Sequence, residues 1–244
     1  MPFTAAHPAI VLPFLRWRRV SASALVVGSI TPDFEYFLRM TLKGIHGHTL
    51  AGLFYFNLPL GLLLLIIFHT VVKVPLIENL PKPIQARLQP LRMFDFITYL
   101  KQRYLTMIIC LMIGSCSHLF WDSFTHYHGY FVQTFRSFYS QVYVPLGNVR
   151  YPLFYALQYI STGVGMTLIA YYLFRLPAQK ADTEVNMSYW LVLCALTLSI
   201  YLIRLAGIPD KVDLSNQVVS FMAAFLWSVI ICGWIFRSKK PRHG

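Results

Sequence analysis

The apolar run from Tyr104 ends in the stretch Gly114-Ser-Cys-Ser-His118-Leu-Phe-Trp-Asp122-Ser-Phe-Thr-His126-Tyr-His128, which carries three histidines and one aspartate. On a helix, His118, Asp122 and His126 recur every four residues and therefore lie along nearly one face. Imidazole nitrogens and carboxylate oxygens at this spacing suit zinc or a similar divalent ion. The alternative is a helix end at a membrane interface, with polar side chains that hydrogen-bond to water and headgroups. The rest of the chain decides between these interpretations.

The composition of the chain is that of an integral membrane protein. Of its 244 residues, 57% are hydrophobic and only 12% are charged, and the mean hydropathy is +0.55. These values lie outside the range of ordinary soluble domains. We expect an all-α, polytopic transmembrane helical bundle of about six spans, forming a single domain over residues 1–244. Within it, residues 1–151 would form the half with the metal site, and residues 152–244 would form three C-terminal spans.

The apolar runs predict the order of the helices. Long runs cover residues 49–72, 104–124, 152–175, 188–208 and 214–236. Two shorter runs, residues 8–15 and 21–30, flank the basic turn Arg16-Trp-Arg-Arg19 and are expected to form a short hairpin. His7 and Asp33 are about equally far from this turn. Folding back of the hairpin would therefore bring them to a similar depth.

Basic residues predict the orientation of the chain in the membrane. The net charge of +12 comes from Lys and Arg residues in the connections, which indicates topology signals and contacts with membrane lipids; no nucleic-acid partner is expected. In the six-span arrangement, fifteen Lys and Arg residues lie on one side and five on the other. The positive-inside bias then places both termini in the cytoplasm. The four cysteines lie in apolar runs without a CxxC pair, so we expect buried free thiols.

This orientation gathers most of the histidines and several acids at one face of the membrane. The residues expected at or near the non-cytoplasmic ends of their spans are Asp33, Glu35, His46, His48, His118, Asp122, His126 and His128. An ionisable side chain near membrane depth costs on the order of 3 kcal/mol on insertion scales, so such residues are functional candidates. A cation shared by the carboxylates would offset this cost. Glu35 is also well placed to pair with Arg39, four residues on.

Several short motifs carry a resemblance to known families. The motifs are Pro2-Phe-Thr-x-x-His7, Gly28-Ser-x-x-Pro32-Asp33, His46-Gly-His48 and Gly114-x-x-Ser-His118-x-x-x-Asp122-x-x-x-His126. They resemble an uncharacterised bacterial family of multi-pass membrane proteins, domain-of-unknown-function family 4184. The pattern is also similar to the LexA-regulated inner-membrane metal-dependent hydrolases and, more remotely, to the zinc-dependent phospholipase C and single-strand nuclease superfamily. The match covers roughly the first half of the chain.

The resemblance implies a set of metal ligands in an all-helical fold. The implied ligands are His7 at the N-terminus, Asp33 of the Pro-Asp pair, His46 or His48 in the middle, His118 with Asp122 on the helix, and His128 or its rival His126 as the later histidine. The soluble enzymes complete a third zinc site with a later His-x-x-x-Glu pair, which this chain lacks because no histidine occurs between His128 and His243. We therefore expect one or two divalent ions, with zinc as the first candidate.

The favoured hypothesis is a metal-dependent hydrolase of the bacterial inner membrane that acts on a lipid-borne or envelope ester or phosphoester. In this hypothesis an open metal position holds a water of lowered pKa, and Asp33 or Glu35 acts catalytically by orienting that water. Two alternatives use the same residues. In the first alternative, the chain is a non-enzymatic metal-binding transport or scaffold protein. In the second, the polar cluster binds no metal and only orders the bundle.

Overall fold

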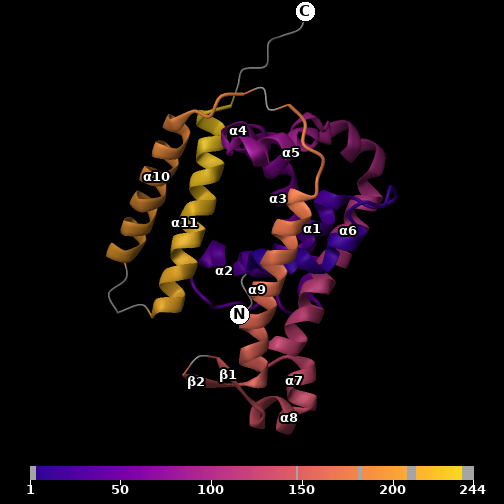
Figure 1. The fold of residues 1–244 in the computed structure, drawn as a ribbon, viewed down its shortest axis with the longest axis vertical. Helices are drawn as coiled ribbons and strands as arrows, with labels where there is room; N and C mark the ends of the chain where they lie inside the picture. Colours follow the sequence, from indigo (N-terminus) through magenta and orange to yellow (C-terminus); the bar gives the residue numbers. More distant parts are fainter. Residues whose placement is uncertain (1–3, 147, 181–182, 208–212, 238–244) are drawn as a thin grey trace, which may run out of the picture. The chain divides into compact units, whose positions relative to one another are not determined.

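The computed structural model describes residues 4–146, 148–180, 183–207 and 213–237, and its elements are labelled in Figure 1. These residues are mostly helical, and their strands form one two-stranded sheet. The helical segments among them that are long and apolar enough to cross a membrane are Leu53–Asn79, Phe96–Thr134, Leu153–Phe174, Met187–Ala206 and Leu214–Ile235. The predicted all-α fold with several spanning helices is confirmed, and these five segments indicate an integral membrane protein.

The N-terminal segment is shorter than a membrane span. It contains the 3-10 helix η1 (Thr4–Phe14), the α-helix α1 (Ala22–Ile30), the 3-10 turn η2 (Thr31–Asp33) and the short helix α2 (Phe34–Arg39). At 1.5 Å per residue, α1 is about 14 Å long, half of the roughly 30 Å hydrocarbon layer. The expected sixth span is therefore too short, and the described residues contain five candidates. η1 and α1 pack against each other as the predicted hairpin.

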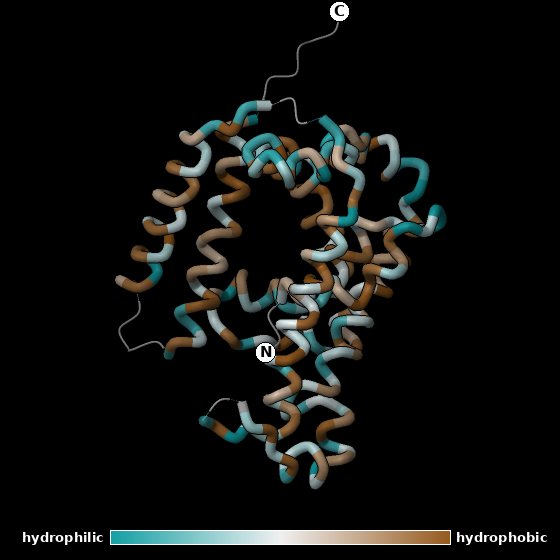
Figure 2. Tube along the Cα trace, viewed as in Figure 1, coloured by the Kyte–Doolittle hydropathy of each residue, from teal (hydrophilic) through white to brown (hydrophobic). Residues whose placement is uncertain are grey.

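Two helices of spanning length follow, and the second carries His118 and Asp122. The first is a continuous helix built from η3 (Leu53–Asn57), α3 (Leu58–Ile67), η4 (Phe68–Val72) and α4 (Lys73–Asn79). η3 and η4 are π-helical turns, a rare geometry that is frequent at functional sites. α5 (Lys82–Met93) follows, and α6 (Phe96–Thr125) forms the second span. Figure 2 shows hydrophobic residues along α3 and many hydrophilic residues in α5.

The remaining elements are two short helices, a hairpin and three long helices. They are α7 (Tyr130–Thr134), α8 (Arg136–Gln141), β1 (Tyr143–Leu146), β2 (Val149–Pro152), α9 (Leu153–Phe174), α10 (Met187–Ala206) and α11 (Leu214–Ile235). The two strands are antiparallel, with Tyr143 opposite Pro152. α10 and α11 begin at side chains that accept a backbone N–H, Asn186 and Asp213. Local capping thus fixes where the last two helices start.

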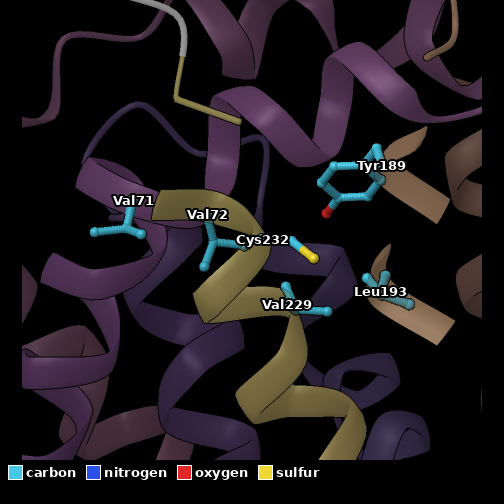
Figure 3. Close-up of a cluster of buried hydrophobic side chains, with 6 residues drawn as sticks. All are labelled: Val71, Val72, Tyr189, Leu193, Val229 and Cys232. Atoms are coloured by element: carbon cyan, nitrogen blue, oxygen red, sulfur yellow. The ribbon is translucent and has the colours of Figure 1, made fainter. Parts of the chain in front are cut away.

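The chain divides into two compact units. The first consists of Met1–Asp33, Ile45–Leu62 and Arg103–Arg175, and the second of Phe34–Gly44, Leu63–Gln102 and Leu176–Gly244. Figure 3 shows an apolar cluster of the second unit, formed by Val71, Val72, Tyr189, Leu193, Val229 and Cys232. The first unit is different in kind, because it contains a buried group of histidines and aspartates.

Candidate metal centre

Two glycines allow α1 and α6 to pack with their backbones in contact. A Cβ atom on Gly28 would lie 2.3 Å from the Leu111 carbonyl oxygen. One on Gly114 would lie 2.4 Å from the Leu25 carbonyl oxygen. Small residues permit such close helix packing in membranes, and the Ser115 hydroxyl donates to the Gly28 carbonyl oxygen at 3.1 Å. The glycines of the two motifs therefore bring the end of α1 against the side chains of α6.

His118 of α6 is fully buried and held in one orientation. Its Nδ1 lies 2.7 Å from the carbonyl oxygen of Ser29 in α1. Nδ1–H is the donor, because a carbonyl oxygen only accepts, so in the neutral ring the lone pair is on Nε2. Nε2 lies 3.2 Å from Asp122 Oδ2 and 3.5 Å from Asp33 Oδ1. A nitrogen with a lone pair thus faces two carboxylate oxygens.

Both carboxylates are oriented by other side chains. Thr4 Oγ1 donates to Asp33 Oδ2 at 2.6 Å, which leaves Asp33 Oδ1 on the side of the α6 imidazole. Asp122 Oδ1 lies 3.1 Å from His7 Nε2 and 3.3 Å from His126 Nδ1. Its other oxygen, Oδ2, is the one close to the α6 imidazole. One oxygen of each aspartate therefore contacts a supporting side chain. The other oxygen lies close to His118 Nε2, which is the common point of the cluster.

His7 reaches this point because the N-terminal hairpin folds back on itself. The residue is buried, and its ring stacks on His118 with centroids 3.8 Å apart and planes at 15°. Thr4 and Asp33, near the two ends of the hairpin, are joined by their hydrogen bond. The structure thus brings His7 and Asp33 together, as the lengths of the two arms of the hairpin predict.

His48 enters the cluster from the loop before η3. A Cβ atom on Gly47 would lie 2.3 Å from the carbonyl oxygen of the residue before Asp33, and Asn57 Nδ2 donates to the Gly47 carbonyl oxygen at 2.8 Å. Glycine is therefore needed for the close approach of this loop to η2. As a result, His48 Nε2 lies 3.3 Å from Asp33 Oδ1 and 3.4 Å from Asp122 Oδ2.

Two sets of three donors can hold a metal ion: His7 with His118 and Asp122, and Asp33 with His48 and His118. In each set the ligand atoms lie within 4.8 Å of one another. Among the described residues, the buried atoms that face this point without a hydrogen-bond partner include Asp33 Oδ1, Asp122 Oδ2 and His118 Nε2. Burying a carboxylate oxygen without a hydrogen-bond partner is costly, and a cation between these two oxygens supplies the partner. The residues therefore fit a divalent ion next to His118 Nε2.

The electrostatics of the residues outside the spans agree with a cation site. Burial opposes ionisation of Asp33, but the charge and polar contacts of His118 and His48 outweigh it and hold the pKa of Asp33 below its usual value. Burial likewise favours neutral His48, but its contacts with Asp122 and Asp33 raise the pKa of His48 to about 9. The two carboxylates thus attract positive charge, whether a proton or a metal ion.

Three of the histidines singled out in the sequence lie outside the two ligand sets. The His126 side chain is 26% exposed and reaches Asp122 from the edge of the cluster. His46 Nδ1 lies 2.8 Å from the Tyr55 hydroxyl. His128 is exposed, with its ring against Tyr127. Between the alternatives left open by the sequence, His48 rather than His46, and His126 rather than His128, lies near the aspartates.

Glu35, which the sequence suggests as a catalytic residue, is buried and pairs with Arg39 Nε at 3.0 Å. It belongs to neither ligand set. Two supporting groups escape sequence reasoning. The Ser29 carbonyl is a backbone group and leaves no signal in the residue type. Thr4 lies within the N-terminal motif, three residues before His7, and that motif was the available signal.

The comparisons with known proteins give a family and no activity. The model of a family described as a domain of unknown function, DUF4184, matches residues 1–234. No curated protein and no solved structure matches the chain. The similarity to hydrolase families expected from the motifs therefore has no support from these comparisons. Because the match extends over nearly the whole chain, from the N-terminal hairpin into the last of the five candidate spans, the protein belongs to the DUF4184 family.

Proposed function

We propose that this protein is a membrane-embedded, metal-dependent hydrolase of the bacterial inner membrane that acts on a lipid-borne or envelope ester or phosphoester. The observation that carries the proposal is the convergence of Asp33 Oδ1 and Asp122 Oδ2 on His118 Nε2. The Ser29 carbonyl fixes the tautomer of the imidazole, as carbonyl and carboxylate acceptors do for histidines that bind metals. Nitrogen and oxygen donors of this kind suit zinc.

The uneven exposure of the cluster supports catalysis over a purely structural metal. The side chains of His118 and Asp33 are 0% exposed, whereas those of His48 and His126 are 27% and 26% exposed. Structural zinc sites are closed, and catalytic sites keep an open position. A divalent ion bound here would act as a Lewis acid toward an ester oxygen and toward water. His126, at the open side, is placed to exchange a proton with a bound substrate.

An apolar pocket beside the cluster supports a lipid as the substrate. Its volume is about 260 Å³, and it is lined by Ile10, Phe120, Trp121, Phe124, Thr125, Leu157 and Ser161. Trp121 and Thr125 of α6 directly precede Asp122 and His126 in the chain, and the Trp121 ring centroid is 6.3 Å from that of His7. An acyl chain in this pocket would place its ester next to the aspartates.

The five-span fold changes the proposed topology. Arg16 lines a pocket together with Arg175, which follows span α9, so the basic turn of the hairpin stays on the side of the C-terminal tail, whereas Thr4 lies at the opposite end of the hairpin, bonded to Asp33. Fifteen Lys and Arg residues then lie on the side of the C-terminal tail and five on the other. The positive-inside bias then keeps the C-terminal tail in the cytoplasm. The N-terminus is proposed to lie on the opposite side, and the cluster near the non-cytoplasmic interface, where a lipid headgroup is within reach.

Metal content of the detergent-purified protein tests the proposal. In protein purified without chelators, we expect elemental mass spectrometry to find about one equivalent of zinc. We expect this zinc to be lost in the His118→Ala variant and in the nearly isosteric Asp122→Asn variant. His69→Ala, which removes another buried histidine of a span, is the matched control and should keep the metal. Absence of stoichiometric metal in the wild type, or its retention in both site variants, would overturn the metal centre.

Hydrolysis is tested separately on protein with a known metal content. Release of product from phospholipid in mixed micelles should stop on chelation and return with zinc. Wild-type protein that binds zinc but cleaves neither phospholipids nor soluble phosphoesters would favour a metal-binding transport or scaffold role, and the hydrolase would be abandoned.

A further inference from the structure

A second pocket lies at the other end of η1, away from His7. It is formed between η1, the turn that follows it and α9, and has a volume of about 630 Å³. Its lining residues are Ala9, Leu12, Pro13, Arg16, Leu168, Tyr171, Tyr172 and Arg175. We refer to it as the η1–α9 groove. None of its residues takes part in the candidate metal centre, so it requires an explanation of its own.

Two arginines line one part of the groove and are held there by tyrosine rings. The guanidinium carbon of Arg16 lies 5.7 Å from the centroid of the Tyr172 ring, and that of Arg175 lies 5.4 Å from the Tyr171 ring. Arg175 Nε also donates to the Tyr171 hydroxyl at 3.0 Å. In the part of the chain that the structure describes, neither arginine forms an ion pair with a carboxylate. Two guanidinium groups therefore line one groove, and no carboxylate of the described residues pairs with either of them.

The depth of the groove matches an amphiphile. Arg175 directly follows the last residue of α9, a candidate span, so it lies where a spanning helix meets the headgroup region. Leu168 is seven residues earlier, about 10 Å deeper along the helix. Leu12 and Pro13 of η1 line the groove with it. The groove thus combines a cationic part at headgroup depth with an apolar wall at the depth of acyl chains.

We propose that the η1–α9 groove binds a phospholipid with an anionic headgroup. Arg16 and Arg175 bind its phosphate oxygens, because planar guanidinium groups form paired, charge-assisted hydrogen bonds with phosphate. One acyl chain lies against Leu12 and Leu168. The described lining residues include no acidic side chain, and both tyrosine rings already face an arginine, so the groove favours an anionic headgroup over a zwitterionic one. This proposal is independent of any hydrolytic activity.

The affinity for defined lipids tests the proposal on the full-length protein in detergent. Native mass spectrometry would compare phosphatidylglycerol, phosphatidylcholine of the same chains, and inorganic phosphate. We expect phosphatidylglycerol to bind preferentially, and the double variant Arg16→Gln/Arg175→Gln to lose roughly tenfold or more of this affinity. Arg136→Gln is the matched control, because Arg136 also lies over a tyrosine, 5.7 Å from the Tyr127 ring centroid, and does not line the groove.

A second variant separates the acyl chain from the headgroup. Leu168→Trp fills the apolar wall at a half-exposed position of α9 and should weaken phosphatidylglycerol binding while both arginines remain. Equal affinities for the two lipids, or an unchanged affinity in the double variant, would overturn the proposal. Phosphate bound as tightly as phosphatidylglycerol would show an anion site without a lipid and would also overturn it. An unchanged metal content in all variants keeps this result separate from the metal centre and shows that the variants are folded.

Discussion

Two buried histidines of the spanning helices, His118 and His69, differ in what surrounds them. His69 of η4 is 7% exposed, and its ring stacks on Phe96 with centroids 4.3 Å apart and planes at 3°. Within the described residues, neither of its ring nitrogens has a hydrogen-bond partner. Lys73, one helical turn further on, adds a positive charge to its neighbourhood. The His118 ring instead donates to the Ser29 carbonyl and faces two carboxylates.

The difference shows that burial of a histidine does not by itself indicate a ligand site. An aromatic stack accommodates a neutral imidazole as a flat, apolar ring. Carboxylate oxygens next to an imidazole lone pair, in contrast, repel one another unless a cation lies between them. We therefore expect substitutions around His118 to change metal binding, and substitutions around His69 to change only packing.

The largest effect on the surroundings of His118 is expected from separating α1 from α6. In Gly114→Ala the new Cβ meets the Leu25 carbonyl oxygen at 2.4 Å, so the helices must move apart and the Ser29 carbonyl leaves His118. We expect a loss of about 3 kcal/mol of stability, the upper range for overpacking, together with the loss of bound zinc. Denaturant unfolding in micelles and metal analysis measure the two effects.

Gly163→Ala is the control for this prediction, because a Cβ atom there meets nothing within 4 Å. It should leave both stability and zinc content unchanged. A Gly114→Ala protein with wild-type stability and zinc content would contradict the role given to the contact between α1 and α6.

A smaller effect distinguishes the two histidines of the loop before η3. His48→Gln removes an imidazole 3.3 Å from Asp33 Oδ1 and should lower zinc affinity about 100-fold, at least the loss typical of supporting residues. His46→Gln removes a ring that contacts Tyr55 and should leave the affinity unchanged. Competition with a chromogenic chelator measures both. An equal loss in the two variants would mean that the loop as a whole, and not His48, is required.

The smallest effect is expected for Thr4, which touches only the supporting oxygen of Asp33. Thr4→Val keeps the shape of the side chain and removes the 2.6 Å hydrogen bond to Oδ2, so zinc affinity should fall about tenfold. Thr167→Val, which removes a hydroxyl bonded to a carbonyl oxygen of its own helix, should have no effect. Titration of metal-free protein with zinc compares the two, and a Thr4→Val affinity equal to that of the wild type would contradict the supporting role.

The sequence predicts the class of fold and the main convergence, because both follow from simple spacings. Apolar runs of spanning length give the long helices, and equal distances from a basic turn bring His7 to Asp33. The choice of His48 over His46 depends on the contact of Gly47 with the backbone before Asp33, which only the folded chain reveals. Whether the short first helix crosses the membrane could not be predicted for a related reason. The length of an apolar run does not distinguish a helix of a hairpin within one unit from a helix that crosses the membrane.

The hydrogen bond from His118 to a main-chain carbonyl has an evolutionary consequence. No exchange of the residue at position 29 can delete a carbonyl oxygen, so a point mutation there leaves the orienting acceptor in place, provided that the new side chain fits. The vulnerable positions are instead Gly28 and Gly114, where any larger residue displaces a helix. Selection for the orientation of this imidazole therefore acts on two residues that make no contact with it through a side chain of their own. A search for functional positions that considers only polar side chains would pass over both.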